Sequence, residues 1–476
     1  MIPTRPTEPA SPSPSVRARR LPPRLAAERA IDVAEAFRDL PGLALLESAR
    51  PGRNARWTYL TADPVAVLEA PAAGADPFAV ARRLVARLDP SPPHDADAPP
   101  FLGGLVGFLG YDLGHALERL PSIALDDQGL PPMRLALHDW VVAWDRRSGE
   151  AWLAGRAVDG DVRGLARRLD EVHARLTSPA AAEAARDDDD APLRFHSGLS
   201  RAEYEAGVET VRGHIAAGDI YQANLTRRLE TPFGGDPWAR YRHLRTGDPS
   251  LFSAYLELGR SPETDRPRAV LSASPEPFLS LDRNGVVATD PIKGTRRRGR
   301  DRAEDRALAC ELLTSAKDRA ENVMIVDVLR NDLGRVCLPG TVRVPRLCRL
   351  ERTAAVQHLV STVTGQLAPG RDAFDLLGAS FPGGSITGAP KIRAMEILEV
   401  LEPVRRGPYT GALGWIGPDG AMQTSILIRT FVADGRRLTL HVGGGITWGS
   451  DPGAEWEETV AKARGPLSAI GGEEVV

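Results

Sequence analysis

The stretch at residues 425–445, Ser-Ile-Leu-Ile-Arg-Thr-Phe-Val-Ala-Asp-Gly-Arg-Arg-Leu-Thr-Leu-His-Val-Gly-Gly-Gly, decides the fold. Its apolar runs at 425–432 and 437–442 have the length and composition of β-strands. Arg429 follows four residues of the first run, where a buried guanidinium would need an anion, either a ligand or a structural Asp or Glu. Gly443, Gly444 and Gly445 follow the second strand, so they would let backbone approach a ligand closely or form a bulge.

Helices and further strands flank this stretch. Residues 200–203, Ser-Arg-Ala-Glu, form a capping box that predicts a helix ending near Gly218. The strand expected at 221–226 alternates apolar residues with hydrogen-bonding ones such as Gln222, so one face can wall a polar site. Strands are also expected at 43–46, 140–144, 269–271 and 411–416, and helices at 77–88 and 162–176. The pattern predicts an α+β fold, a large mixed or antiparallel β-sheet assembly flanked by helices.

The composition is that of a globular, enzyme-sized chain. Its 476 residues carry a net charge of -3, which gives no electrostatic signature of nucleic-acid or anionic-membrane binding. The three cysteines fit neither a disulfide framework nor a zinc site, and the apolar run at 101–111 is short and broken by glycines. We therefore expect a cytoplasmic protein that acts on small molecules, without nucleic-acid or membrane partners.

Low-complexity segments suggest the domain organisation. Residues 1–24 are rich in Pro, Ser and Arg and are expected to form a disordered tail. The acidic stretch at 178–194 is expected to link an N-terminal region, 25–177, to a catalytic domain at 195–468.

One lysine stands in a stiff turn, Asp-Pro-Ile-Lys-Gly-Thr at 290–295. The arginines that follow at 296–298 would disfavour a further positive charge, so Lys293 is expected to be partly neutral near pH 7 and nucleophilic. The alternative is a solvated run of charges. Glu276 is either a general acid whose pKa burial raises or a turn carboxylate, and His358 is either catalytic or structural.

Two predicted helices each present a pair of acids. Asp318 and Glu321 lie three residues apart in one helix, as do Glu455 and Glu458 in the other, so each pair shares one helical face. Four carboxylates from two helices could bind a hard cation such as Mg²⁺. The alternative is a pair of surface helices stabilised by ion pairs such as Glu458 with Lys462.

Two further segments adjoin helices. Residues 381–391, Phe-Pro-Gly-Gly-Ser-Ile-Thr-Gly-Ala-Pro-Lys, precede a predicted helix at 392–401 whose free N–H groups could bind an anion. A carboxylate fits better than a phosphate, because the Gly-Lys-Ser/Thr order of a phosphate loop is absent. Asp451 is expected to cap the helix that carries Glu458, and Gly465 with Pro466 to end it.

Taken together, these segments resemble the chorismate-using enzymes, and the match covers nearly the whole chain after the tail. The N-terminal half, with the segments at 45–48 and 101–112, is similar to the amino-terminal region of anthranilate synthase and aminodeoxychorismate synthase large subunits. The segments that carry the resemblance in the other half are Tyr-Gln-Ala-Asn-Leu at 221–225, Ser-Ala-Ser-Pro-Glu at 272–276, Pro-Ile-Lys-Gly-Thr at 291–295, Gln-His-Leu-Val-Ser at 357–361 and Tyr-Thr-Gly at 409–411. The fold implied is that of anthranilate synthase component I.

The resemblance implies a magnesium site and its substrate. Glu321 and Glu458 would ligate Mg²⁺ bound to the ring carboxylate of chorismate, with Asp318 and Glu455 in supporting positions. This assignment agrees with the helical spacing of the two acid pairs.

The resemblance also implies roles around the ring. Tyr409 and Arg429 would hold the enolpyruvyl carboxylate, Glu276 would protonate the departing C4 hydroxyl, and His358 would lie beside the ring. The residues that would help to position the ring are Thr295, Lys462, Gly443, Gly444 and Gly445.

Two positions distinguish branches of this family. Members that add water to chorismate carry a lysine base where this chain has Gln222, an amide that cannot deprotonate water. Anthranilate synthases usually have a small residue where this chain has Lys293. The resemblance therefore implies an aminodeoxychorismate synthase large subunit, a transferase of 4-aminobenzoate and folate biosynthesis that forms a covalent lysine intermediate. The alternative is anthranilate synthase component I.

Two partners are implied. No cysteine has the Gly-x-Cys-x-Gly setting of an amidotransferase nucleophile, so a separate glutamine amidotransferase subunit is expected to supply ammonia. Glu47, Ser48 and Pro249 lie in segments that resemble the tryptophan pocket of the wider family. Tryptophan binding, as regulator or as structural ligand, stays open at this point.

Overall fold

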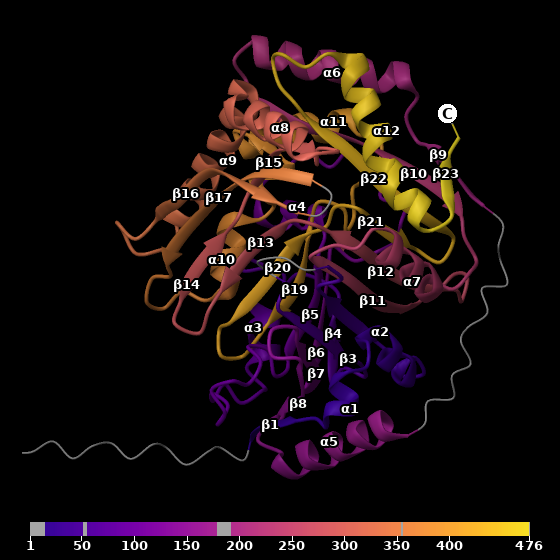
Figure 1. Ribbon diagram of the computed structural model, residues 1–476, viewed down its shortest axis with the longest axis vertical. Coiled ribbons are helices and arrows are strands. Elements are labelled where there is room, and N and C mark those ends of the chain that lie inside the picture. Colours follow the sequence, from indigo (N-terminus) through magenta and orange to yellow (C-terminus); the bar gives the residue numbers. More distant parts are fainter. Residues whose placement is uncertain (1–14, 51–54, 179–191, 354–355, 476) are drawn as a thin grey trace, which may run out of the picture.

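The structure is a computed structural model that describes residues 15–50, 55–178, 192–353 and 356–475. Two β-sheets pack face to face, and helices cover their outer faces (Figure 1). The predicted α+β fold with antiparallel sheets flanked by helices is confirmed. In the described ranges no helix has the length and apolar content needed to cross a membrane.

The larger sheet has thirteen strands drawn from both ends of the chain. β2 pairs antiparallel with β11, and this pairing joins the strands of the N-terminal region to those of the catalytic region. In spatial order the sheet contains β1 (Val16–Arg20), β8 (Glu150–Arg156), β7 (Trp140–Asp145), β3 (Trp57–Thr61), β2 (Ala44–Glu47), β11 (Phe252–Arg260), β12 (Pro267–Ser274), β21 (Thr430–Ala433), β22 (Arg437–Ile446), β10 (Gln222–Pro232), β9 (Leu193–Ser197) and β23 (Gly472–Glu474), with β18 (Gly388–Ala389) paired to β10.

The smaller sheet has ten strands and is joined in the same way. β19 of the catalytic region pairs antiparallel with β5 of the N-terminal region. Its order is β15 (Ile292–Arg297), β17 (Val356–Gln366), β14 (Val286–Thr289), β13 (Pro277–Leu281), β20 (Met422–Ile426), β19 (Ala412–Ile416), β5 (Gly104–Leu109), β6 (Met133–His138) and β4 (Ala66–Leu68), with β16 (Arg343–Arg352) paired to β17.

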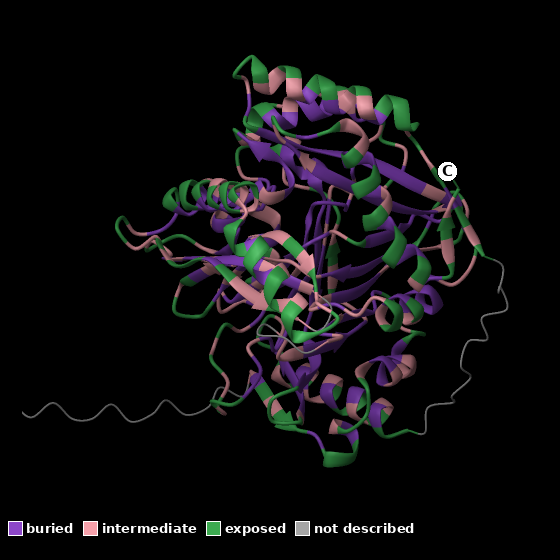
Figure 2. Cartoon of the chain, turned by 45° about the horizontal axis from the view of Figure 1, so that its top comes forward, coloured by how far each residue is buried: buried purple, intermediate pink, exposed green. Residues whose placement is uncertain are grey.

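Apolar side chains hold the layers together. Between the sheets, Tyr59 and Val270 of the larger sheet share a core with Trp415 of the smaller one, and burying each such side chain stabilises the fold by roughly 1.5–3 kcal/mol. Figure 2 shows the strands largely buried while the helices expose their outer faces. The helices of eight or more residues outside the sheets are α5 (Val162–Thr177), α6 (Arg201–Ala216), α7 (Pro237–Gly247), α8 (Arg302–Thr314), α9 (Ala316–Gly334), α10 (Ala373–Ser380), α11 (Lys391–Leu401) and α12 (Pro452–Ala469); α3 (Ala79–Val85) is shorter.

The domain boundaries need correction. The predicted tail is wrong from residue 16 onward, because β1 adds to the edge of the larger sheet beside β8 and Leu21 and Leu25 enter the core. Residues 193 and 194 of the predicted linker belong to β9, and β23 extends the catalytic region beyond residue 468 by pairing with β9. Residues 1–14 and 179–191 lie outside the described ranges.

The predicted strand at 425–432 is in fact two strands in different sheets. β20 ends at Ile426 in the smaller sheet, and β21 begins at Thr430 in the larger one. Between them Arg429 has a φ of 51°, a left-handed conformation that interrupts a strand. The predicted burial of Arg429 is also wrong, since its side chain is 47% exposed. The break carries the chain from one sheet to the other.

The end of α12 also differs from the prediction. The helix continues through Pro466 to Ala469. Pro466 and Leu467 are both buried, and Leu467 packs in the core beneath the larger sheet. Tertiary burial therefore outweighs the cost of an internal proline, which is about 3 kcal/mol.

A pair of glycines tests the register of the smaller sheet. Gly107 on β5 lies opposite Gly414 on β19, and a Cβ on Gly107 would lie 1.9 Å from the carbonyl oxygen of Arg134. We predict that Gly107→Ala lowers the free energy of unfolding by about 3 kcal/mol or more in urea denaturation. The matched change Gly213→Ala, in open space on α6, should raise it by about 1 kcal/mol. A Gly107 variant as stable as the parent would contradict the pairing of β5 with β6.

Candidate active site

Lys293 lies on β15 with its amine turned toward protein atoms. Its Nζ donates a hydrogen bond to the carbonyl oxygen of Ser385 at 3.2 Å. Burial lowers the pKa of Lys293 below its usual 10.5, although the carboxylates of Glu276 and Glu321 oppose this shift. A lowered pKa enlarges the neutral, nucleophilic fraction of the amine near neutral pH.

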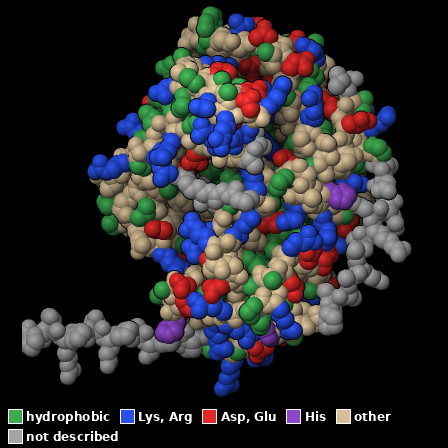
Figure 3. All heavy atoms as spheres, viewed as in Figure 1, with side chains coloured by type: hydrophobic (Ala, Val, Ile, Leu, Met, Phe, Trp, Pro, Cys, Tyr) green, Lys and Arg blue, Asp and Glu red, His purple; other side chains and the backbone are tan. Residues whose placement is uncertain are grey.

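The arginines that follow Lys293 are not the cause of this shift, contrary to the prediction from the sequence. Figure 3 shows Lys and Arg side chains gathered over β15 and α8. Arg296 pairs with Glu311 at 2.7 Å and Arg298 with Asp305 at 2.7 Å, so acids neutralise their charges locally. Desolvation rather than repulsion lowers the pKa of Lys293.

Glu276 follows the end of β12 and faces Lys293. Burial raises the pKa of Glu276 above its usual 4.5, while Lys293 and a hydrogen bond with Ser385 act in the opposite direction. The backbone fixes this position, because the Ile426 N–H donates to the Glu276 carbonyl oxygen at 3.0 Å. A carboxyl group with a raised pKa beside an amine with a lowered one suits a general acid next to a nucleophile.

The predicted acid pairs lie on α9 and α12. Burial raises the pKa of Glu321, and the charges of Asp318 and Glu458 add to this effect. Burial also raises the pKa of Glu455, again with a contribution from Glu458. For Glu458 itself, burial is outweighed by Lys462, whose Nζ lies 2.7 Å from its carboxylate, so the pKa is lowered.

This acid set has the chemistry of a site for a hard cation. Glu321 and Glu458 come from different helices and still repel each other, which a bound divalent ion would relieve. Three of the acids already have cationic partners: Asp318 pairs with Arg296 at 3.1 Å, Glu458 with Lys462, and Glu321 with Lys317 at 4.0 Å. Across the described ranges no three His, Cys, Asp or Glu side chains converge as a ready-made metal cluster. A metal ion would therefore compete with Lys462 for Glu458.

The three glycines of β22 leave room for neighbouring groups. A Cβ on Gly443 would lie 2.5 Å from a carbonyl oxygen of β10, and one on Gly444 would lie 2.9 Å from Glu455 Oε2. A Cβ on Gly445 would lie 2.4 Å from Gln222 Nε2. Gln222 is buried, and its Oε1 has no hydrogen-bond partner in the described structure. The lack of side chains at these glycines thus leaves space for Gln222 and Glu455. The predicted contact of the glycines with the substrate ring stays a prediction.

Thr295 and His358 lie side by side across β15 and β17, with Oγ1 and Nδ1 2.9 Å apart. Burial lowers the pKa of His358 to about 4, and Arg429 contributes to the shift, so the ring is neutral near pH 7. Tyr409 is buried and stacks on His441 with ring centroids 5.0 Å apart, and the N–H of the adjacent Thr410 donates to the Leu427 carbonyl oxygen at 2.7 Å. The predicted contact of Tyr409 with a carboxylate of the substrate stays a prediction. The structure thus brings Arg429 to His358.

In the segment at 381–391, the side chain of Lys391 has partners within the chain, while the predicted binding of an anion by the backbone N–H groups stays a prediction. Lys391 Nζ donates to Asp332 Oδ2 and to the Ser380 carbonyl oxygen, each at 2.9 Å. This pair ties the start of α11 to α9, which carries Glu321, and it adjoins the turn that carries Ser385. The sequence gave no signal for this ion pair between Lys391 and Asp332.

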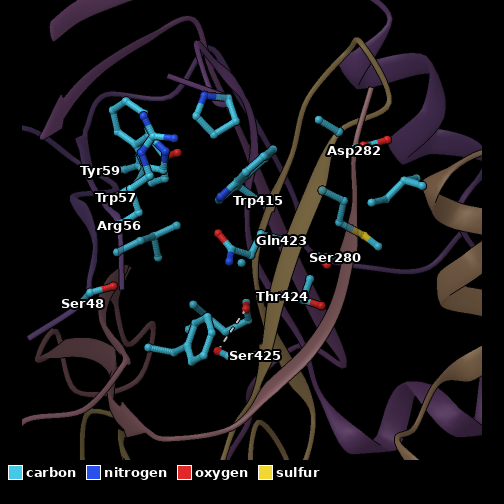
Figure 4. Close-up of a pocket in the computed structure, with 18 of the residues that line it drawn as sticks. Ser48, Arg56, Trp57, Tyr59, Ser280, Asp282, Trp415, Gln423, Thr424 and Ser425 are labelled. Carbon is cyan, nitrogen blue, oxygen red and sulfur yellow. Dashed lines mark hydrogen bonds between the residues drawn. The ribbon is translucent and has the colours of Figure 1, made fainter. Parts of the chain in front are cut away.

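A cavity of about 600 Å³ lies between the two sheets, and neither Lys293 nor Glu276 lines it. Trp57 and Tyr59 project into it from β3, and Trp415 faces them from β19 (Figure 4). The cavity is therefore distinct from the site around Lys293.

Two of the three residues predicted for a tryptophan pocket line this cavity. Glu47 and Ser48 line it, whereas Pro249 does not. The Glu47 carboxylate already accepts hydrogen bonds from Arg245 at 2.6 Å and from Tyr241 at 2.7 Å. Glu47 therefore forms structural hydrogen bonds with Arg245 and Tyr241, which its sequence motif did not indicate.

Comparisons with known proteins agree with these motifs. Residues 44–468 match the family described as chorismate binding enzyme. The chain is 42% identical over 439 residues to anthranilate synthase component 1 of Streptomyces coelicolor, covering 90% of this chain and 83% of that protein. It is also 42% identical over 395 residues to aminodeoxychorismate synthase component 1 of Escherichia coli, covering 83% of each. The crystal structure of anthranilate synthase component I from Streptococcus pneumoniae matches with a TM-score of 0.77 at 31% identity, covering 88% of this chain and 93% of that chain.

The pair of Lys391 and Asp332 gives a test of how the site is built. The two side chains are 13% and 3% exposed, so removing one charge leaves the other buried. We predict that Lys391→Met lowers the free energy of unfolding by about 3–5 kcal/mol. The double variant Lys391→Met with Asp332→Asn should lose less than the sum of the single losses. Lys317→Met, at an exposed lysine, should change stability by less than about 0.5 kcal/mol. Strictly additive losses would show that the pair is not coupled.

Proposed function

The chain belongs to the chorismate-binding enzyme family, and from this premise we propose that it is the large subunit of an aminodeoxychorismate synthase. It converts chorismate and ammonia to 4-amino-4-deoxychorismate for 4-aminobenzoate and folate biosynthesis. The observation that carries the proposal is the desolvated amine of Lys293 beside the carboxyl group of Glu276. No such nucleophile is needed for a binding function alone.

Lys293 and Glu276 carry out the first half of the reaction. The neutral amine forms a bond to C2 of the ring while the bond from C4 to its hydroxyl breaks. Glu276 gives its proton to the departing oxygen, so water leaves. Burial shifts the two pKa values in the directions that this step requires, down for the amine and up for the acid.

Ammonia completes the reaction. It attacks C4 and the bond from C2 to Lys293 Nζ breaks, which restores the amine. Glu276, left as a carboxylate by the first half, accepts the proton that the incoming nitrogen loses. A glutamine amidotransferase subunit supplies the ammonia, as the component 1 names of the relatives suggest.

The carboxylates of the substrate are held at two places. Glu321 and Glu458 would hold Mg²⁺, with Asp318 and Glu455 in support, because their oxygens and mutual repulsion fit a hard cation. When bound, the ion would fix the ring carboxylate and neutralise its charge. Arg429 receives the enolpyruvyl carboxylate, a role that its exposed, left-handed position leaves accessible.

Anthranilate synthase component I is the second candidate. Relatives of both names are about equally similar to this chain. Both reactions would use the same acids and carboxylate contacts, but amination at C2 does not use a lysine nucleophile at C2. Lys293 therefore favours amination at C4, and an assay that resolves anthranilate from 4-aminobenzoate separates the two.

The cavity between the sheets supports tryptophan as a second, unreacting ligand. Trp57, Tyr59 and Trp415 offer aromatic faces, and Ser48 and Gln423 offer polar groups for an amino-acid head. Calorimetric titration with tryptophan should show saturable binding to the parent and none to Ser48→Trp, whose indole would fill the cavity. Equal heats from both proteins would contradict this assignment.

The role of Lys293 predicts the behaviour of Lys293→Ala. This variant should keep the unfolding free energy and chorismate affinity of the parent and lose most C4 amination, because the nucleophile is gone. Turnover is measured with ammonium, which removes the need for the partner, as 4-aminobenzoate formed after adding the lyase. Intact mass spectra of protein quenched during turnover should show an adduct in the parent that the variant lacks. Undiminished amination by Lys293→Ala would rule out the covalent route.

The metal assignment predicts a contrast between neighbouring acids on α12. Glu458→Gln should lower the rate by roughly a hundredfold or more and raise the Mg²⁺ concentration for half-maximal rate. Glu457→Gln is the matched control, because Glu457 is 62% exposed and pairs with Arg201. If both variants titrate with Mg²⁺ like the parent, Glu458 is not a ligand.

A further inference from the structure

The side chains of Arg50 and Arg429 both lie near one carboxylate, that of Asp248. Arg429 donates a hydrogen bond from Nη1 to Asp248 Oδ1 at 3.4 Å. The backbone places Arg50 beside the same group, because the N–H of Ala49 donates to the carbonyl oxygen of Ser250 at 2.9 Å. Segments from β2, β11 and the crossing between the sheets thus meet at this point.

Asp248 does not satisfy both guanidinium groups. Arg50 Nε and Asp248 Oδ2 are buried and have no hydrogen-bond partner in the part of the chain that the structure describes. Burial lowers the pKa of Arg50, and repulsion by Arg429 adds to it, while Asp248 opposes both. Among the described residues, two cations thus face one carboxylate, so one positive charge has no partner in a partly desolvated place, which is costly unless an anion binds.

The positive charges of Arg50 and Arg429 act on His358, which lies next to Thr295 in the candidate active site. After burial, Arg50 and then Arg429 are the charges that lower the pKa of His358. His358 contacts Thr295 at 2.9 Å, and Thr295 lies two residues from Lys293 on β15. An anion held by the two arginines would therefore lie on the His358 side of the site.

We infer that Arg50 is a further substrate-binding residue, which joins Arg429 in binding one carboxylate of the substrate. The identity of that substrate as chorismate rests on the proposed function. Two guanidinium groups offer a carboxylate more N–H donors than one, and they can hold its plane in a fixed direction. Asp248 then keeps Arg429 oriented and limits the repulsion between the arginines before substrate binds. The family motifs gave no signal for Arg50, since its contribution comes from a contact between distant segments.

The test compares Arg50→Gln and Arg50→Lys with the control Arg349→Gln, at an exposed arginine of the edge strand β16. Chorismate is titrated by calorimetry, and kcat and KM are measured with ammonium as the nitrogen source. Arg50→Gln should raise both Kd and KM for chorismate about tenfold or more, with kcat within about threefold of the parent. Arg50→Lys keeps the charge and should show a smaller loss, while Arg349→Gln should match the parent.

Each outcome bears on a definite claim. A Kd and KM for Arg50→Gln within twofold of the parent values would overturn the role of Arg50, even if the parent aminates chorismate at C4. A loss confined to kcat would also overturn it, because binding would then be intact. A parent that binds chorismate without C4 amination would overturn the proposed function alone, since the Kd comparison still tests Arg50. A parent that binds no chorismate would overturn both.

Discussion

The desolvation of one amine organises the site. The ammonium form of Lys293 loses hydration on β15, and the protein returns only part of that stabilisation through one carbonyl oxygen and nearby carboxylates. Glu276 is desolvated in the same place, which favours its protonated form. Lys293 lies on β15, whereas Glu276 lies between β12 and β13, where the Ile426 N–H at the end of β20 fixes its backbone. Burial between the packed elements therefore favours the neutral amine of Lys293 and the protonated carboxyl group of Glu276, whereas both groups would be charged in water.

The distribution of lysines is consistent with this constraint. Only four of the 60 Lys and Arg residues are lysines: Lys293, Lys317, Lys391 and Lys462. Lys293 must be able to lose its proton, which a guanidinium cannot do. Lys462 links Glu458 to the Gly443 carbonyl oxygen, and Lys391 anchors α11 to α9. Lys317 is exposed and pairs with Glu321 at 4.0 Å. All four lysines therefore lie in the site, at its edge or directly behind it, whereas arginines supply most ion pairs of the surface.

The sequence predicted what depends on local pattern and could not predict what depends on distant segments. Periodicity and caps located α6, α11 and most strands, and the acid spacing on α9 and α12 was confirmed. The break at Arg429 was missed, because an apolar run does not reveal that its two ends enter different sheets. The lowered pKa of Lys293 was predicted for the wrong reason, since the acids that neutralise the adjoining arginines lie on α8. Arg50 has no local signature for the same reason.

The most direct test of the account is the pH dependence of amine labelling at Lys293, read by peptide mass spectrometry. With four lysines in the chain, the labelled peptides are few and easily separated. The account predicts a midpoint for Lys293 below the usual 10.5, and a lower one in Glu276→Gln, because the Glu276 carboxylate opposes the shift. A midpoint at or above 10.5 would show that the amine is not destabilised as a cation, and it would contradict the central claim.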